Sequence, residues 1–299
     1  MNAPIVTVIG VGNMGGGMAA NLLAKGWDVR ICDIDAAKAA ALVQVGAKAI
    51  ASPADAPVDS QVFIVCVVDA AQTEEVLFGG QGLARMLRPG HAVMLCPTIA
   101  PQDVESFAAR LAECGVHTLD APMSGGPARA REGSMSLMLA CTQAVYTQHA
   151  GLLRDLSAKV FHISEKPGDG ARTKLVNNLL AGINLVGAAE ALALAGRMGL
   201  NLATTLDVIE QSSGQSWIGS DRMRRAIAGD YAPRAHMTLL EKDTRLAVAA
   251  ARAAGFEGPL GERASRVFAE AHQAGLGAED DAALFKHLGN LGNADSRGG

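Results

Sequence analysis

The chain has 299 residues, of which 49% are hydrophobic, so it is long enough to bury the core of one large or two ordinary domains. Its formal net charge of −4 gives no electrostatic reason to expect a nucleic acid or an anionic membrane as a partner. The longest apolar runs, such as Val62 to Val68, have the length of strands, and the N-terminus lacks a signal core. We therefore expect a cytoplasmic protein with a small-molecule partner and no membrane contact.

The cysteines and histidines do not show the spacing of a metal site. No CxxC pair occurs, most cysteines lie within apolar stretches, and the histidines lie singly. We therefore predict reduced, buried thiols and no bound metal. The five cysteines are Cys32, Cys66, Cys96, Cys114 and Cys141.

Short β-rich segments alternate with alanine-rich helical segments through the first half of the chain. This alternation is typical of a parallel sheet wrapped by helices. After Gly170 the pattern is helical, beginning with one unbroken stretch from about Ala171 to Met198. The predicted strands are Ile5 to Ile9, Val29 to Asp33, Val62 to Val67, Ala92 to Cys96, Val116 to Asp120, Met135 to Ala140 and Val160 to Ile163.

The long predicted helix is apolar on every side. Leu175, Val176, Leu179, Leu180 and Leu185 fall all around its axis, which predicts burial on most faces. A helix of this length that protrudes from a sheet domain would expose much apolar surface in a monomer. We therefore expect a homodimer or homotetramer that uses this helix.

A glycine-rich segment directly follows the first predicted strand. It has the form GxGxxG and opens a helical stretch, which is the context of a dinucleotide-binding turn. The first glycine allows the tight turn, the second lets backbone amides approach a pyrophosphate, and the third lets the helix pack close to the strand. The helix N-terminus then faces the phosphate charge. We place in this cofactor site Gly10, Gly12, Asn13, Met14 and Gly15.

Asp33 ends the second predicted strand, about 20 residues after the first glycine, where dinucleotide-binding domains have the acid that binds the ribose hydroxyls. A carboxylate there repels the 2′-phosphate of NADP, and no arginine follows it directly, so the predicted cofactor is NAD. A solvated acid at a strand end is the alternative. We also place Val67, at the end of the third predicted strand, among the cofactor-binding residues.

The alternating elements and the glycine turn together define the predicted fold. We expect an α/β protein with a Rossmann-type, doubly wound, mostly parallel sheet that binds NAD in residues 1–165. Residues 166–299 are predicted to form an all-α domain for substrate binding and oligomerisation. The long helix joins the two domains.

Two further segments follow predicted strands, at the edge where open parallel sheets bind ligands. Thr98 stands just after one strand. Ser124, Gly125 and Gly126 follow another, and this serine with the two glycine amides would form a neutral cradle suited to a carboxylate. An ordinary turn is the alternative for the second segment.

Lys174, Asn177 and Asn178 lie together at the start of the long helix. Lys174 and Asn178 are four residues apart and share a helix face. A lysine that is buried beside a cofactor loses solvation, which suits it to exchange a proton with an alcohol as hydride leaves. The alternative is a lysine whose stem lies on apolar surface while its charged end reaches water, with asparagines that cap the helix.

Taken together, these motifs resemble those of the 3-hydroxyisobutyrate dehydrogenase, or β-hydroxyacid dehydrogenase, family over nearly the whole chain. The resemblance implies that Lys174 is the catalytic acid/base and that Asn178 orients the substrate. It implies that Ser124 to Gly126 hold the substrate carboxylate. It also implies that Thr98 lies near the nicotinamide ribose and that Lys242 closes over the cofactor.

This chain departs from the family pattern at two places. Met123 stands where a valine is usual, and Cys96-Pro97 precedes Thr98 where the family often has a serine. Neither change removes a group that carries a proton. We therefore expect them to alter the shape of the pocket rather than its chemistry.

Within the family, the helical half resembles the L-threonate dehydrogenase branch. Gln215, Ser216 and Trp217 are expected to line the substrate pocket, where polar groups suit a hydroxylated acid better than isobutyrate. The segments that carry the resemblance are Ser213 to Trp217, Arg222-Met223, Gly229 to Arg234 and Gly277 to Asp281.

The expected function is the NAD-dependent oxidation of a small 3-hydroxy acid, such as L-threonate or 3-hydroxyisobutyrate, by hydride transfer from C3. One alternative is a reductase of small semialdehydes of the glyoxylate or succinic semialdehyde type, although related reductases usually prefer NADP. A second is an imine reductase, although those relatives generally lack the lysine. A third is a non-catalytic, NAD-binding oligomeric scaffold, which would not need Lys174, Asn178 and Ser124.

Overall fold

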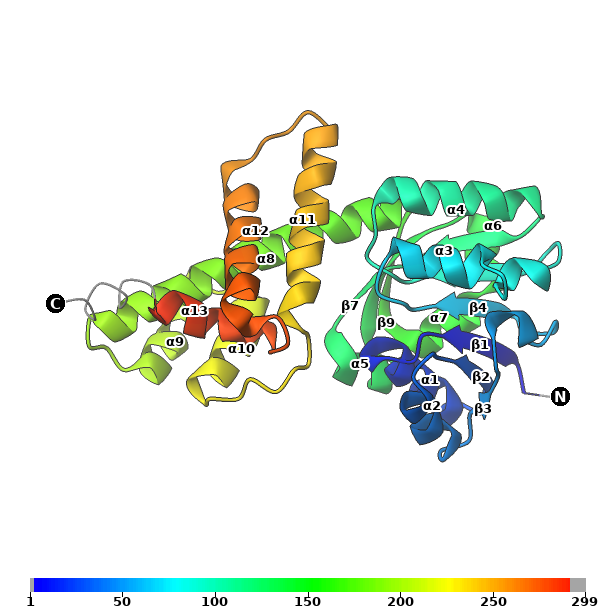
Figure 1. Cartoon of the computed structure of the whole chain (residues 1–299), viewed down its shortest axis with the longest axis horizontal. Coiled ribbons are helices and arrows are strands. Elements are labelled where there is room, and N and C mark those ends of the chain that lie inside the picture. Colours follow the sequence, from blue (N-terminus) through cyan, green and yellow to red (C-terminus); the bar gives the residue numbers. More distant parts are fainter. Residues whose placement is uncertain (1–2, 291–299) are drawn as a thin grey trace. The chain divides into compact units, whose positions relative to one another are not determined.

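The computed structural model describes residues 3–290, which divide into two compact units joined within one helix (Figure 1). The first unit ends at Lys174 and the second begins at Leu175. The helix that contains this junction is α8, Asp169–Arg197. The prediction of one unbroken helix from about Ala171 to Met198 is therefore confirmed.

One sheet organises the first unit. The described residues form nine strands, and six of these follow the order β3-β2-β1-β4-β5-β6 with parallel pairing. This is the strand order of a dinucleotide-binding domain, whose ligand crevice opens beyond the carboxyl ends of β1 and β4. The strands are β1 Ile5–Ile9, β2 Asp28–Cys32, β3 Lys48–Ala49, β4 Val62–Val65, β5 Ala92–Leu95, β6 His117–Asp120, β7 Met123–Ser124, β8 Met135–Ala140 and β9 Ser157–Ser164.

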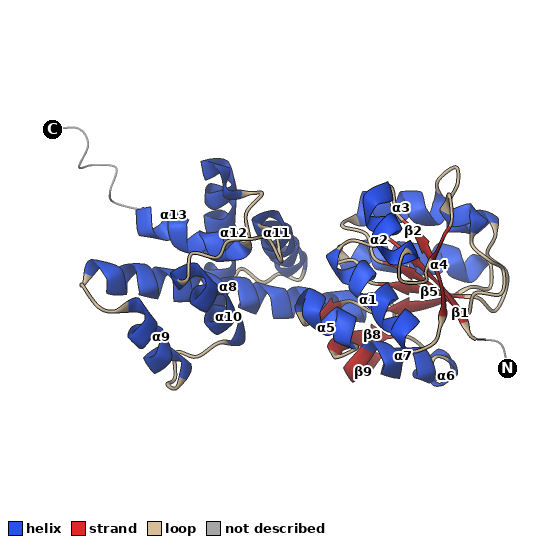
Figure 2. Cartoon of the chain, turned by 90° about the horizontal axis from the view of Figure 1, so that it is seen from below, coloured by secondary structure: helices blue, strands red, loops and turns tan. Residues whose placement is uncertain are grey.

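Helices lie on both faces of this sheet (Figure 2). Alternate residues of β4 enter two separate hydrophobic cores, because successive side chains of a strand point to opposite faces. Val62 and Ile64 pack in the core that contains α1, and Phe63 and Val65 pack in the core that contains α4. The helices are α1 Asn13–Ala24, α2 Ala36–Val43, α3 Ala70–Phe78, α4 Pro101–Glu113, α5 Gly126–Glu132, α6 Gln143–Gln148 and α7 Ala150–Leu156.

Every strand that the sequence predicts is present, and the sheet is mostly parallel as predicted. The bounds of β1 and β8 match the prediction, whereas β9 extends beyond the predicted Val160 to Ile163 at both ends. The sequence predicts neither β3 nor β7, because a strand of two residues carries no alternation of apolar and polar side chains. The pairs of β8 with β6 and β7 are antiparallel.

The second unit is helical, as the sequence predicts. Leu185 of α8 packs in a core with Met223 of α10 and Phe268 of α12. α12 approaches α8 closely at Gly261, where a Cβ atom would lie 2.9 Å from Leu179 Cδ1. The further helices are α9 Leu202–Glu210, α10 Trp217–Ile227, α11 Met237–Ala253, α12 Pro259–Ala271 and α13 Leu284–Asn290.

The prediction that α8 is buried on most faces is wrong for this chain taken alone. Val176, Leu180 and Leu194 are each more than half exposed, and 33% of the most apolar window of the helix is buried. By length and mean hydropathy, α8 also meets the criterion for a membrane-spanning helix, which the core helix of a soluble protein meets as well. Apolar residues on every side of a helix do not indicate which of its faces are covered by the rest of the chain.

The cysteines are free thiols, and most of them are shielded from solvent. Cys32, Cys96 and Cys141 are buried, as predicted, and Cys66 is half-buried. Burial raises the pKa of Cys66 to about 12 and that of Cys96 well above its usual value, so both stay protonated. Cys114 is exposed at the C-terminal end of α4, and the prediction of a buried thiol is wrong there.

Candidate active site

The glycine-rich turn connects β1 to α1 and is open at its middle glycine. Gly10 has φ +86°, and a Cβ atom there would lie 2.6 Å from the carbonyl oxygen of Cys66, so this position requires glycine. At Gly15 a Cβ atom would lie 1.9 Å from the carbonyl oxygen of Gly10. At Gly12 no atom lies within 4 Å of that position. A ligand can therefore approach the backbone closely at Gly12.

Asn13 and Met14 begin α1 and place their backbone at the positive end of its dipole. The first turn of α1 holds no acidic side chain, and Gly12 supplies no side-chain cap. An anionic ligand is therefore favoured at this end of the helix. Together with the open backbone at Gly12, the helix end fits the pyrophosphate of a dinucleotide.

Asp33 lies just beyond β2 and contacts the glycine-rich turn. Its Oδ2 accepts a hydrogen bond from the backbone N–H of Val11 at 2.6 Å, and its Oδ1 accepts one from Asp35 at 2.8 Å. The following residue, Ile34, is fully exposed. These contacts hold a carboxylate beside the turn, at the position where the sequence predicts a ribose-binding acid.

Val67 and Thr98 follow two neighbouring strands of the sheet. Val65 of β4 and Leu95 of β5 are paired in parallel, so the residues just beyond them share one edge. Val67 contacts the glycine turn, because a Cβ atom at Gly10 would lie 3.0 Å from its Cγ1. Thr98 is half-buried beyond β5. The predicted cofactor residues of the first unit thus gather at the carboxyl ends of β1, β2, β4 and β5.

Lys174 ends the first unit and directs its amine toward the segment after β6. Its Nζ donates a hydrogen bond to the backbone carbonyl oxygen of Met123 at 2.6 Å, and the residue is only 9% exposed. Because Met123 directly precedes Ser124, the amine lies next to the predicted carboxylate cradle. The alternative of a lysine whose charged end reaches water does not fit this burial.

Asp120 ends β6 and anchors the start of α8. It is 1% exposed, and its Oδ2 accepts hydrogen bonds from the backbone N–H groups of Gly168 at 2.7 Å and Ala171 at 3.2 Å. Burial raises the pKa of Asp120 to about 6, although the backbone hydrogen bonds oppose this shift. Since Lys174 follows Ala171 within one helical turn, this contact holds the lysine at the edge of the sheet.

The cradle after β7 is formed by backbone that glycine alone adopts readily. Gly125 has φ +135° and Gly126 has φ +73°, and no atom lies within 4 Å of the Cβ position at Gly126. Ser124 is held in β7, where it pairs with Ser136 of β8. Successive amides in such a turn form a concave surface that suits an anion.

In the second unit, Asn178 and Lys242 share Asp243 as a partner. The Asn178 Nδ2 donates a hydrogen bond to Asp243 Oδ2 at 2.6 Å, and Lys242 Nζ forms an ion pair with Asp243 Oδ1 at 2.8 Å. Asn177 is exposed but donates a hydrogen bond to Asn178 Oδ1 at 3.0 Å. The amide group of Asn178 is therefore held in one orientation from both ends.

Trp217 begins α10 and lines a groove of about 500 Å³ in the second unit. Its side chain is half exposed, and Gln215, Asp221 and Arg225 line the same groove. Ser216 has a structural role, since its hydroxyl caps α10 by accepting the N–H of Gly219 at 3.1 Å. The groove thus combines one aromatic surface with several polar groups.

Several charged residues of the L-threonate dehydrogenase-like segments bind one another. Arg222 Nε donates to Asp281 at 2.6 Å, and Arg234 forms an ion pair with Asp230 at 2.8 Å. Asp280 is fully buried and accepts the backbone N–H of Arg234 at 2.8 Å. Their role in this structure is to hold α10 against the segments on either side of α11 and α12.

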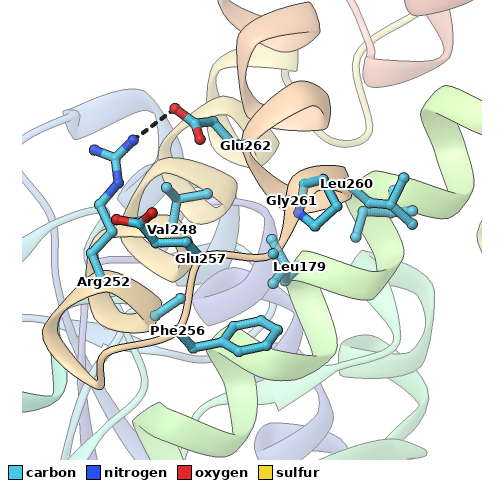
Figure 3. A pocket seen from close by; sticks show the side chains of 12 residues that line it. Leu179, Val248, Arg252, Phe256, Glu257, Leu260, Gly261 and Glu262 are labelled. Carbon is cyan, nitrogen blue, oxygen red and sulfur yellow. Dashed lines mark hydrogen bonds and ion pairs between the residues drawn. The ribbon is translucent and has the colours of Figure 1, made fainter.

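A second groove, of about 270 Å³, lies between α8 and the segment that joins α11 to α12 (Figure 3). Leu179, Phe256 and Leu260 give it an apolar lining, and an ion pair of 2.7 Å between Arg252 and Glu262 lies at its rim. None of the predicted site residues lines this groove. Its lining suits contact with an apolar surface rather than a small hydroxy acid.

Comparison with known proteins identifies the family. Residues 5–164 match the NAD binding domain of 6-phosphogluconate dehydrogenase, and residues 168–288 match the family described as NAD-binding of NADP-dependent 3-hydroxyisobutyrate dehydrogenase. The L-threonate dehydrogenase of Cupriavidus necator H16 is 38% identical over 281 residues, which cover 94% of this chain and 95% of that protein. The chain belongs to the 3-hydroxyisobutyrate dehydrogenase family.

Other members of this family agree with the chain over nearly its full length. The 3-hydroxyisobutyrate dehydrogenase of Pseudomonas aeruginosa PAO1 is 33% identical over 270 residues, 88% of this chain and 90% of that protein. A crystal structure of 3-hydroxyisobutyrate dehydrogenase from Salmonella typhimurium has a TM-score of 0.89 and 36% identity, and covers 95% of this chain and 99% of that chain. The chain is therefore a hydroxyacid oxidoreductase with an NAD-binding domain.

Two acidic residues of this dehydrogenase position predicted site residues, although the sequence analysis does not include either acid in the site. Asp120 holds the start of the helix that carries Lys174, and Asp243 holds Asn178. The available signals are an acid at the end of a predicted strand and an acid next to Lys242. Neither signal shows which group the carboxylate binds, because both contacts join segments that are far apart in the sequence.

Proposed function

We propose that this dehydrogenase oxidises a small 3-hydroxy acid at C3 with NAD, and that the substrate is a hydroxylated acid of the L-threonate type. The observation that carries the proposal is the position of Lys174, whose Nζ lies 2.6 Å from the carbonyl oxygen of Met123. The amine is therefore next to Ser124, where the carboxylate cradle begins. A 3-hydroxy acid carries its hydroxyl and its carboxylate two carbons apart, which suits two binding groups that are neighbours.

The proposed mechanism assigns one task to each group. The carboxylate of the substrate accepts hydrogen bonds from the Ser124 hydroxyl and the amides of Gly125 and Gly126. The C3 hydroxyl donates to the neutral amine of Lys174, which removes the proton, while Asn178, one turn further along α8, orients that hydroxyl. Bound NAD supplies the acceptor for the C3 hydride. General base assistance of this kind contributes about 10²- to 10⁴-fold to the rate.

The preference for NAD over NADP is part of the proposal and rests on Asp33. Its carboxylate is held beside the glycine turn by the N–H of Val11 at 2.6 Å. A carboxylate at the end of β2 accepts hydrogen bonds from ribose hydroxyls and repels a 2′-phosphate. Binding of the nicotinamide ribose by Thr98, and of the cofactor by Lys242, stays a prediction from the family resemblance.

The choice of a hydroxylated acid rests on the second unit and on the relatives. Gln215 and Trp217 line a groove of the second unit, and the family resemblance implies that these residues line the substrate pocket, where polar groups hydrogen-bond hydroxyls better than they accommodate a methyl branch. Curated relatives that are 36–38% identical include several named L-threonate dehydrogenase. Both observations favour a polyhydroxy acid over 3-hydroxyisobutyrate.

The test is NADH formation, measured by absorbance, with a panel of 3-hydroxy acids and both cofactors. The panel contains L-threonate, D-threonate, L-serine, 3-hydroxyisobutyrate and 3-hydroxypropionate. We expect the highest kcat/KM with L-threonate and NAD. Turnover of 3-hydroxyisobutyrate alone would contradict the substrate type. If no acid of the panel is oxidised but glyoxylate or succinic semialdehyde is reduced, the protein is a semialdehyde reductase. If neither oxidation nor reduction is detected, the result favours a non-catalytic scaffold.

We also infer a cytoplasmic homo-oligomer in which a second copy of the chain covers the exposed apolar face of α8. Val176 and Leu180 on α8 are each more than half exposed, and so are Phe256 and Leu260, which line the groove of Figure 3. Leu180→Glu is expected to produce monomers in light scattering, whereas Lys38→Glu on α2 leaves the assembly unchanged. A wild-type monomer would contradict this inference.

A further inference from the structure

The carboxylate cradle of the first unit is made of neutral groups. Ser124 supplies a hydroxyl, and Gly125 and Gly126 supply backbone amides. A cationic donor adds a coulombic attraction to a carboxylate that neutral donors such as a hydroxyl or a backbone amide do not supply. An enzyme that selects acids over neutral alcohols therefore gains from a positive charge beside such a cradle.

Arg129 places its side chain directly against the cradle. A Cβ atom at Gly125 would lie 2.8 Å from Cδ, 3.0 Å from Cβ and 3.4 Å from Cγ of Arg129. Arg129 lies on α5, the helix that begins immediately after Gly125, and its residue is exposed. The aliphatic part of the side chain thus lies along Gly125, and only the guanidinium group extends beyond Cδ.

The packing of α5 against α1 restricts the position of the Arg129 side chain. Gly17 of α1 packs against α5, since a Cβ atom at Gly17 would lie 2.9 Å from Ala130 Cβ and 3.2 Å from the carbonyl oxygen of Pro127. Gly133 ends α5 in the left-handed conformation with φ +68°. The short helix is therefore fixed to the dinucleotide-binding helix, and the Arg129 stem is fixed relative to the cradle.

We propose that Arg129 is a substrate-binding residue whose guanidinium group binds the carboxylate held by Ser124, Gly125 and Gly126. The planar fork of an arginine matches the two oxygens of a carboxylate, and its charge does not depend on pH in the working range. Arg129 thereby determines the preference of the enzyme for acids over neutral hydroxy compounds. This inference rests on the proposed function, because it assumes that the cradle holds the substrate carboxylate.

Arg131 offers a matched control on the same helix. It is also an exposed arginine of α5, and its backbone nitrogen would lie 3.1 Å from a Cβ atom at Gly17. Residues two positions apart point to different sides of a helix, so the side chains of Arg129 and Arg131 lie on different faces. Replacing either one with glutamine removes the same charge from the chain, and the atoms nearest to the Cβ position at Gly125 all belong to Arg129.

The kinetic test compares Arg129→Gln, Arg129→Lys and Arg131→Gln with the wild type, using L-threonate and its primary amide as substrates. For Arg129→Gln we expect KM for L-threonate to rise about tenfold to a hundredfold, with little change in kcat or in KM for NAD. The preference for the acid over the amide falls by the same factor. Arg129→Lys keeps part of the preference, and Arg131→Gln keeps all of it.

A binding experiment keeps this proposal separate from the proposed catalytic function. Titration calorimetry of L-threonate against the NADH-loaded protein measures carboxylate binding without turnover. Weaker binding for Arg129→Gln, with unchanged binding for Arg131→Gln and equal melting temperatures, supports the proposal even if the wild type does not oxidise L-threonate. Equal effects of Arg129→Gln and Arg131→Gln on the acid-to-amide preference, or no L-threonate binding by the wild type, would overturn it.

Discussion

Motif residues behave differently in the two units of this dehydrogenase. In the first unit, the glycine turn, Asp33, Ser124 and Lys174 all gather near the carboxyl ends of strands, and open backbone remains at Gly12. In the second unit, the residues that resemble the L-threonate dehydrogenase branch mostly bind one another, as Arg222 does with Asp281. Motif residues of the first unit thus meet at one open edge of the sheet, whereas several of those in the second unit are engaged with one another.

The difference follows from the two architectures. The carboxyl ends of parallel strands converge at one edge of a sheet, so polar residues placed there meet each other and a ligand. Helices have no such shared edge, and polar residues between them are satisfied by neighbouring helices or loops. A polar motif after a strand in an α/β domain is therefore stronger evidence of function than a polar motif in a helical domain.

The largest expected effect is on catalysis in the first unit. Lys174→Ala removes the amine that lies beside the cradle and is expected to lower kcat about 10²- to 10⁴-fold. NAD binding, measured by fluorescence titration, should stay close to that of the wild type. Lys166→Ala, eight residues earlier at an exposed position, serves as the control. Equal turnover in the two variants would remove Lys174 from the mechanism.

In the second unit, we expect substitutions of motif residues to lower the free energy of unfolding. Arg222→Leu leaves Asp281, which is 1% exposed, without its ion-pair partner, and is expected to lower the free energy of unfolding by about 3–5 kcal/mol. Burial raises the pKa of Asp281 to about 7 despite the opposing arginine, so part of the loss is relieved by protonation. Urea denaturation measures the change.

Arg224→Leu is the matched control for that experiment. Arg224 is on the same helix, but its ion pair with Asp207 is at the surface, where such pairs contribute at most about 1 kcal/mol. If the two leucine variants are equally stable, the buried ion pair of Arg222 with Asp281 does not stabilise the fold.

The contact of Asp120 with the start of α8 predicts an effect of intermediate size, namely a dependence of the free energy of unfolding on pH. The pKa of Asp120 is raised from 3.8 to about 6, so its contribution to stability is fully present below about pH 4 and is lost as the pH rises through 6. Asp120→Asn is neutral at every pH, and its stability relative to the wild type should improve between pH 4 and 7 by at most about 3 kcal/mol. Parallel stability curves for the two proteins would show that Asp120 does not titrate in this range.

The smallest expected effect is on cofactor choice. Asp33→Ser removes the carboxylate that accepts the N–H of Val11, and is expected to raise KM for NAD about tenfold to a hundredfold while KM for NADP falls. Asp35→Ser, two residues later, should leave both values unchanged, since that carboxylate accepts the N–H of Ala37 at the start of α2. An unchanged ratio of the two KM values in Asp33→Ser would refute the assignment of Asp33.

Much of the fold is predictable because its signals are local. The β1 strand, the glycine turn and α8 are each recognised from adjacent residues, and the structure contains them where the sequence predicts them. The missed strands β3 and β7 have two residues each, too few for a periodic pattern. The burial of α8 was also not predictable, because the apolar residues around its axis do not indicate which of them meet the rest of the chain.

The candidate site is predictable to the extent that it depends on residue type. Ser124 and Lys174 stand out in sequence, but the 2.6 Å contact of Lys174 with the Met123 carbonyl does not, because a backbone oxygen has no sequence signature. The partners of Asp120 and Asp243 also depend on segments that meet only after folding. Contacts between distant segments thus account for the part of the site that the sequence could not provide.

The uneven shielding of the cysteines makes the protein easy to label at one position. Cys114 is exposed, Cys32, Cys96 and Cys141 are buried, and Cys66 is half-buried and held protonated by burial. A maleimide reagent is therefore expected to react at Cys114 in the folded wild-type chain far faster than at the other thiols. A fluorophore can be placed on the first unit without changing the sequence, which gives a direct optical probe of that unit during ligand binding.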